Sequence, residues 1–174
     1  MFDYRGFGES DDFTINKDML YYCQFEQDLM AVMKFAKIKY PKNKTGIWAF
    51  SMGTIITTLV NETARPAFII ADGFVTNPLK LKEAWSTKDK LFLLPDDANT
   101  YEVKLAAIKE PMLIFSGKQD KVTTDAEIQK LKKTKPNIKV VSFDGAHMMG
   151  LQTLSKEYPG SQYIAEIDKF LAKK

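Results

Sequence analysis

Short runs of mostly apolar residues alternate along this chain with longer segments of helical periodicity. Each run has the length of a strand, and runs that are apolar on both faces are typical of strands buried inside a parallel sheet. The alternation therefore predicts an α/β fold, in which helices cover both faces of a mostly parallel sheet. We expect the strands at residues 45–50, 67–71, 111–115 and 138–143.

The segments between these runs predict amphipathic helices. The first is expected at residues 17–40, and others at 54–61, 125–133 and 157–172. Cys23, the single cysteine, falls on the apolar face of the first helix, so we expect a buried thiol. The apolar stripe of that helix consists of Phe25, Leu29, Val32, Met33 and Ala36.

The length of 174 residues suits one domain, which we place at residues 1–174. Residues 73–110 interrupt the rhythm of strands and helices with two short helical patches, near 79–85 and 101–108. We interpret residues 73–110 as a small cap-like insertion in that domain.

The charge balance excludes two classes of partner. The chain has 25 basic and 22 acidic residues, which is too even to predict binding to nucleic acid or to a membrane surface. The lysine-rich residues 130–139 lack interleaved aromatic residues and are typical of a solvated helix face. No apolar run approaches the ~18 residues of a membrane span. We expect a cytoplasmic protein with no nucleic-acid partner.

The most informative local pattern surrounds Ser51. An apolar strand runs directly into Ala49-Phe50-Ser51-Met52-Gly53, and a helix follows. This matches the G-x-S-x-G nucleophile elbow with Ala49 at the first glycine position, where a sharp turn strains the serine and exposes its hydroxyl. A serine that merely caps the following helix is the alternative interpretation of Ser51 by itself.

An acidic residue and the only histidine follow two later strands. The strand at 111–115 leads through a glycine turn to Asp120, and the strand at 138–143 leads through Asp144-Gly145-Ala146 to His147. Parallel sheets place their sites at the carboxyl ends of the strands, so Ser51, Asp120 and His147 are expected to meet there. Asp72, at the end of the second strand, and Asp144 are alternative acids.

These motifs together resemble the α/β-hydrolase superfamily over nearly the whole chain. The resemblance is to single-domain serine hydrolases of the serine aminopeptidase-like or acylglycerol-lipase-like kind. Residues 2–10 (FDYRGFGES) are similar to the family's D-x-R-G-x-G-x-S loop, and residues 117–120 (GKQD) to its G-x-x-D turn. Residues 145–147 (GAH) are similar to its histidine loop. The glycines of residues 6–8 do not make a dinucleotide fingerprint, because the third glycine is missing.

The resemblance implies a serine hydrolase that cleaves a carboxylic ester, thioester or amide through an acyl-enzyme intermediate. Ser51 would be the nucleophile, His147 the base and Asp120 the acid that orients it. The N–H of Met52, the residue after the nucleophile, would donate to the oxyanion. We expect a small-molecule acyl substrate, and neither a cofactor nor a metal ion.

The family's fold has about three strands before the loop at residues 2–10, and this chain does not contain them. One of those strands would lie beside residues 45–50, so we expect an exposed sheet edge there that allows self-association. The family's loop after the third strand, which supplies the second oxyanion donor, is absent with them. These departures leave a non-catalytic or truncated hydrolase-like binding domain as the alternative function.

The sequence does not choose between two roles for the apolar side chains of the insertion. They could line an acyl pocket, or they could only anchor the insertion to the rest of the domain. These side chains are Phe74, Leu79, Trp85, Leu91, Phe92 and Leu94.

Overall fold

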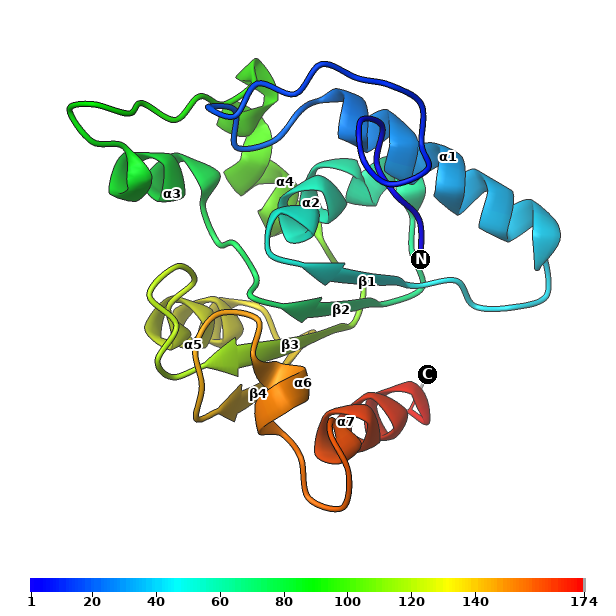
Figure 1. The fold of residues 1–174 in the computed structure, drawn as a ribbon. Coiled ribbons are helices and arrows are strands. Elements are labelled where there is room, and N and C mark those ends of the chain that lie inside the picture. The colour runs from blue at the N-terminus through cyan, green and yellow to red at the C-terminus, as the bar shows by residue number, and fades with distance from the viewer. Residues whose placement is uncertain (174) are drawn as a thin grey trace. The chain divides into compact units, whose positions relative to one another are not determined.

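A computed structural model describes residues 1–173, which include a parallel sheet of four strands (Figure 1). The strands are hydrogen-bonded in chain order, and every neighbouring pair is parallel. The α/β prediction is confirmed, and all four predicted strands are present within a few residues of their expected bounds. They are β1 (Ile47–Phe50), β2 (Ile69–Asp72), β3 (Met112–Gly117) and β4 (Ile138–Phe143).

Helices fill the connections between the strands, as parallel pairing requires. Local capping explains where several of them begin. Asn77 accepts hydrogen bonds from Leu79 N and Lys80 N at the start of α3, and Thr124 accepts from Glu127 N at the start of α5. The helices are α1 (Gln24–Lys39), α2 (Met52–Ala64), α3 (Pro78–Trp85), α4 (Tyr101–Ala107), α5 (Asp125–Thr134), α6 (Gly150–Thr153) and α7 (Ser161–Leu171), with a 3₁₀ helix at Asp96–Thr100.

The chain divides into two compact units. The sheet unit comprises Gly46–Thr54, Ala67–Thr76 and the chain from Lys109 onward. The helical unit comprises Met1–Thr45, Ile55–Pro66 and Asn77–Ile108. The prediction of one domain with an insertion at 73–110 stays a prediction.

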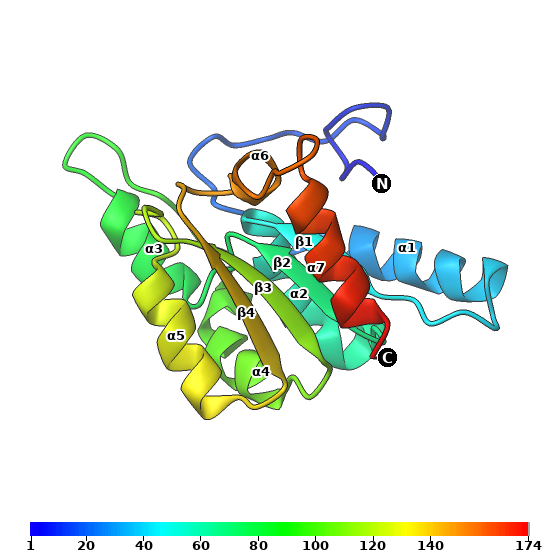
Figure 2. The ribbon, with the colours of Figure 1, turned by 90° about the horizontal axis from the view of Figure 1, so that it is seen from below.

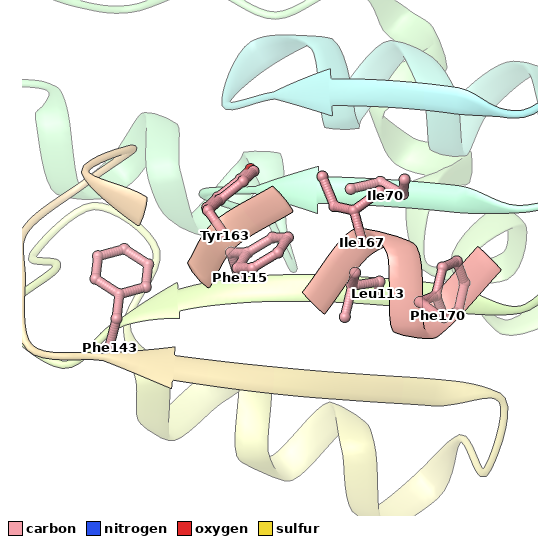
Figure 3. Close-up of a cluster of buried hydrophobic side chains, with 7 residues drawn as sticks. All are labelled: Ile70, Leu113, Phe115, Phe143, Tyr163, Ile167 and Phe170. Carbon is pink, nitrogen blue, oxygen red and sulfur yellow. The ribbon is translucent and has the colours of Figure 1, made fainter. Parts of the chain in front are cut away.

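Within the sheet unit, α5 and α7 cover opposite faces of the strands. On the α5 face, Ser142 of β4 donates to Asp125 and accepts from Gln129. On the other face, which lies toward the viewer in Figure 2, α7 packs Tyr163 against Phe115 with ring centroids 3.8 Å apart. The buried cluster under α7 consists of Ile70, Leu113, Phe115, Phe143, Tyr163, Ile167 and Phe170 (Figure 3).

The helical unit has its own apolar centre around Phe25, on which the aromatic rings of Tyr4, Phe13 and Tyr22 pack. A bidentate ion pair between Arg5 and Asp28 holds the N-terminal loop to α1. The insertion is joined to the same unit by backbone pairing: Leu20 N donates to Leu93 O, and Leu93 N donates to Asp18 O. The Tyr21 hydroxyl adds a hydrogen bond to Asp97 at 2.5 Å.

This backbone pairing corrects the prediction for the first helix. Residues 17–23 are not helical, because Met19 forms an isolated parallel bridge with Leu93. The helix begins at Gln24, so Cys23 lies before it and is exposed; the prediction of a buried thiol was wrong. The last helix likewise begins at Ser161 rather than 157, after Gly160 with a φ of +78°.

Candidate active site

Ser51 stands between β1 and α2 in a strained conformation. Its φ is +44°, a left-handed backbone that costs an ordinary residue on the order of 1–3 kcal/mol. Two hydrogen bonds hold the turn: Ser51 N donates to Asp72 O at 3.1 Å, and Thr54 N donates to Ser51 O at 2.9 Å. The strained strand-to-helix turn expected from the sequence is therefore present.

The turn is not tightly packed around both of the small residues beside Ser51. Ala49 is buried, but a Cβ added to Gly53 would lie 3.8 Å from the Ala49 Cβ, an ordinary van der Waals contact. The structure therefore leaves room for one methyl group at position 53.

His147 connects Ser51 to an acid. Its Nε2 lies 2.8 Å from Ser51 Oγ, and its Nδ1 lies 2.8 Å from Asp120 Oδ2. The loop after β4 supplies His147 and the loop between β3 and α5 supplies Asp120, so the three side chains converge at the carboxyl ends of three strands.

Asp120 is held as an anion. Its carboxylate accepts from Val122 N at 2.7 Å, from Thr123 N at 2.9 Å and from Thr123 Oγ1 at 2.7 Å. Burial by itself would raise the pKa of Asp120, but hydrogen bonds from His147, Thr123 and Val122 outweigh burial and lower that pKa below its ordinary value. An anionic Asp120 selects the tautomer with the proton on Nδ1, which leaves Nε2 free to accept from the Ser51 hydroxyl.

The two alternative acids do not occupy this position. Asp144 accepts a hydrogen bond from Gln119 Nε2 at 2.9 Å. Asp72 is 1% exposed, and its carboxylate faces the Gly150 N–H and the Tyr163 hydroxyl, without a hydrogen bond of ordinary geometry among residues 1–173. Of the three acids considered, Asp120 is the one bonded to His147.

A family model described as "Serine hydrolase (FSH1)" matches residues 3–155, which is most of the chain. The chain belongs to the FSH1 serine hydrolase family. Among curated protein sequences, none matches this chain.

Solved structures with the same fold include other serine hydrolases. An esterase from Pyrococcus furiosus is 21% identical with a TM-score of 0.72, over 98% of this chain and 68% of that one. A thermophilic esterase from Thermogutta terrifontis is 16% identical with a TM-score of 0.63, over 98% and 78%. An α/β serine hydrolase homologue from Coxiella burnetii is 16% identical with a TM-score of 0.62, over 98% and 66%. This serine hydrolase therefore spans about two thirds of the length of the Pyrococcus and Coxiella proteins.

The sequence did not single out Gly73, a glycine of this serine hydrolase whose backbone lies against the imidazole of His147. Its φ is +69°, and a Cβ placed on it would lie 2.6 Å from His147 Cε1. Gly117 has a similar role one strand away, where a Cβ would lie 2.5 Å from Gly145 O. Gly73 directly follows β2, and Gly117 is the last residue of β3. A glycine at the carboxyl end of a buried strand was therefore the sequence signal that could have identified both residues.

The remaining predicted site residue is Met52. It is the first residue of α2, where backbone N–H groups have no carbonyl of the same helix to bond and the helix dipole favours negative charge. Among the described residues, no group of three or more potential metal ligands is present. In the same part of the chain, no helix is long and apolar enough to cross a membrane.

Proposed function

We propose that Ser51, His147 and Asp120 form a catalytic triad that hydrolyses a carboxylic ester, thioester or amide. The observation that carries this proposal is the continuous hydrogen-bond relay from Ser51 Oγ through His147 to Asp120, with both contacts at 2.8 Å. The left-handed φ of Ser51 supports it, because strain of this kind is rare outside functional sites.

The chemistry follows from the positions of the groups. Ser51 Oγ attacks the acyl carbonyl while His147 Nε2 takes the hydroxyl proton, and anionic Asp120 stabilises the resulting imidazolium. The Met52 N–H would donate to the oxyanion of the tetrahedral intermediate. The imidazolium returns its proton to the leaving group, and an acyl group remains on Ser51. Water, deprotonated by His147, then releases the acid and restores Ser51.

An ester is the favoured substrate class. The Pyrococcus and Thermogutta proteins of the same fold are named esterases, which supports this choice. The acyl specificity depends on whether the apolar side chains of the insertion line an acyl pocket or only anchor the insertion. These side chains differ in exposure, since Phe74 is buried and Leu91 is exposed.

The test is covalent labelling with a fluorophosphonate, followed by a panel of p-nitrophenyl esters of increasing acyl length. The wild type should label at one site and hydrolyse at least one ester, and Ser51→Ala should abolish both. Ser10→Ala, which removes a half-buried serine of the helical unit, is the matched control and should leave both unchanged. Labelling that persists in Ser51→Ala would refute the assignment of Ser51 as the nucleophile. No labelling of the wild type would favour the non-catalytic binding domain instead.

We also propose that the protein acts on small molecules and not on nucleic acid, and that it self-associates through the edge of β1. The near-even charge supports the first point. The second is supported by the position of β1 at one end of the described sheet and by Trp48 and Phe50, which are about half exposed.

A reducing compartment such as the cytoplasm suits the single exposed thiol of Cys23, and the localisation of a fluorescent fusion would test this proposal.

A further inference from the structure

Asp72 is a buried carboxyl group that the proposed triad does not use. It is the last residue of β2, and Ile70 two residues earlier belongs to the cluster under α7, so the Asp72 side chain lies on the α7 face of the sheet. The residue is 1% exposed, and within residues 1–173 both carboxylate oxygens and the Tyr163 hydroxyl lack a hydrogen-bond partner of ordinary geometry. Buried acids are nearly always paired, so this arrangement calls for an explanation.

The surroundings of Asp72 connect it to both reacting side chains. Its carbonyl oxygen accepts from Ser51 N, and the next residue, Gly73, lies against the imidazole of His147. Its carboxylate is directly beneath the start of α6, because a Cβ added to Gly150 would lie 2.7 Å from Asp72 Oδ2. Since α6 follows the His147 loop, the carboxylate faces the base of that loop.

The charge on Asp72 depends on a small set of groups. Burial raises the pKa of Asp72 to about 6, against the opposing influence of the Gly150 N–H, the Tyr163 hydroxyl and His147. Asp120 raises that pKa further by like-charge repulsion. Asp72 is therefore mostly protonated at pH 5 and mostly ionised at pH 7.

We propose that Asp72 is a positioning residue for His147: its buried carboxylate stabilises the imidazolium through space, while Asp120 holds the same ring by a hydrogen bond. The neutral ring of the resting enzyme gains little from this charge. The imidazolium formed as Ser51 attacks gains much more, so the effect lowers the barrier rather than tightening substrate binding. This inference rests on the proposed function.

Asp72→Asn tests the proposal because it removes the charge and keeps the shape. With an ester that the wild type hydrolyses, kcat above pH 7.5 should fall on the order of tenfold while KM stays unchanged. The loss of kcat relative to the wild type should shrink as the pH falls below 6, because wild-type Asp72 is then protonated and has no charge to lose. Asp144→Asn is the matched control, since its carboxylate bonds Gln119, and it should leave the pH profile of kcat unchanged.

Tyr163→Phe is a second, milder variant that keeps the ring stacked on Phe115. Loss of its hydroxyl should raise the pKa of Asp72. As the pH is lowered, kcat should therefore begin to fall at a higher pH than in the wild type, while kcat at pH 8.5 stays near normal. A pH profile unchanged in both variants would overturn the proposal, as would equal losses at every pH. If Asp72→Asn does not fold, the profile of Tyr163→Phe decides alone. Failure of Ser51→Ala to abolish activity would instead count against the proposed function.

Discussion

Gly73→Ala should disable the site through a single methyl group. The added Cβ would lie 2.6 Å from His147 Cε1 and 3.0 Å from Nδ1, whereas carbon atoms in contact are normally ~3.5–4.0 Å apart. The imidazole must therefore move by about 1 Å. A displacement of this size breaks the alignment with Ser51 and can lower the rate by about 10²-fold.

The same substitution also affects stability. At a φ of +69°, alanine is strained by about 1–2 kcal/mol relative to glycine. We therefore expect kcat to fall by about 10²-fold and the free energy of unfolding to fall by about 1–2 kcal/mol. Ester hydrolysis at saturating substrate and urea unfolding measure the two effects separately.

Gly53→Ala is the matched control on the other side of the nucleophile. Its Cβ would meet only the Ala49 methyl at 3.8 Å, and it lies in α2, where alanine is favoured over glycine by about 1 kcal/mol. This variant should keep its activity and be as stable as the wild type or more so. Equal kcat for Gly73→Ala and the wild type would refute the reasoning, and so would a larger loss in Gly53→Ala.

Three further outcomes are expected. Asp120→Asn should lower kcat by about 10³–10⁴-fold by favouring the wrong tautomer of His147, whereas Asp144→Asn should have little effect on ester hydrolysis; reversed effects would contradict the assignment. Asp72 has its pKa raised from 3.8 to about 6, so it contributes stability below pH 3.8 that is lost as the pH rises through 6. Urea unfolding should therefore show that the free energy of unfolding of Asp72→Asn, relative to the wild type, is about 3 kcal/mol higher at pH 8 than at pH 3.5, since one pKa unit corresponds to about 1.4 kcal/mol. A difference between variant and wild type that does not change with pH would contradict this prediction. Trp48→Lys should reduce self-association at the β1 edge in sedimentation experiments, and a wild type that stays monomeric at high concentration would remove the basis for that proposal.

The fold class was determined by the sequence alone. Mostly apolar runs at 45–50, 67–71, 111–115 and 138–143 are best buried between two layers of helices, so their alternation with amphipathic segments leaves few other arrangements. The turn at Ser51 was equally accessible, because an apolar strand, a serine between small residues and a helix are all local features. Local periodicity predicts such elements since it depends only on near neighbours in the chain.

Contacts between distant segments decided what the sequence left open. Asp72, Asp120 and Asp144 all follow strands, and only the folded chain shows which carboxylate bonds His147. The non-helical course of residues 17–23 follows from a bridge between Met19 and Leu93, which no local pattern encodes.

The surroundings of Asp72 and Gly73 were also invisible in the sequence. Tyr163 and Gly150 reach Asp72 from the far end of the chain, and the absence of a Cβ at Gly73 matters because His147 lies against it. Local patterns fix which residues can form strands, helices and turns. The pKa of a buried carboxyl and the room for a methyl group depend on the atoms that tertiary packing brings within a few ångströms, and only the folded structure decides these.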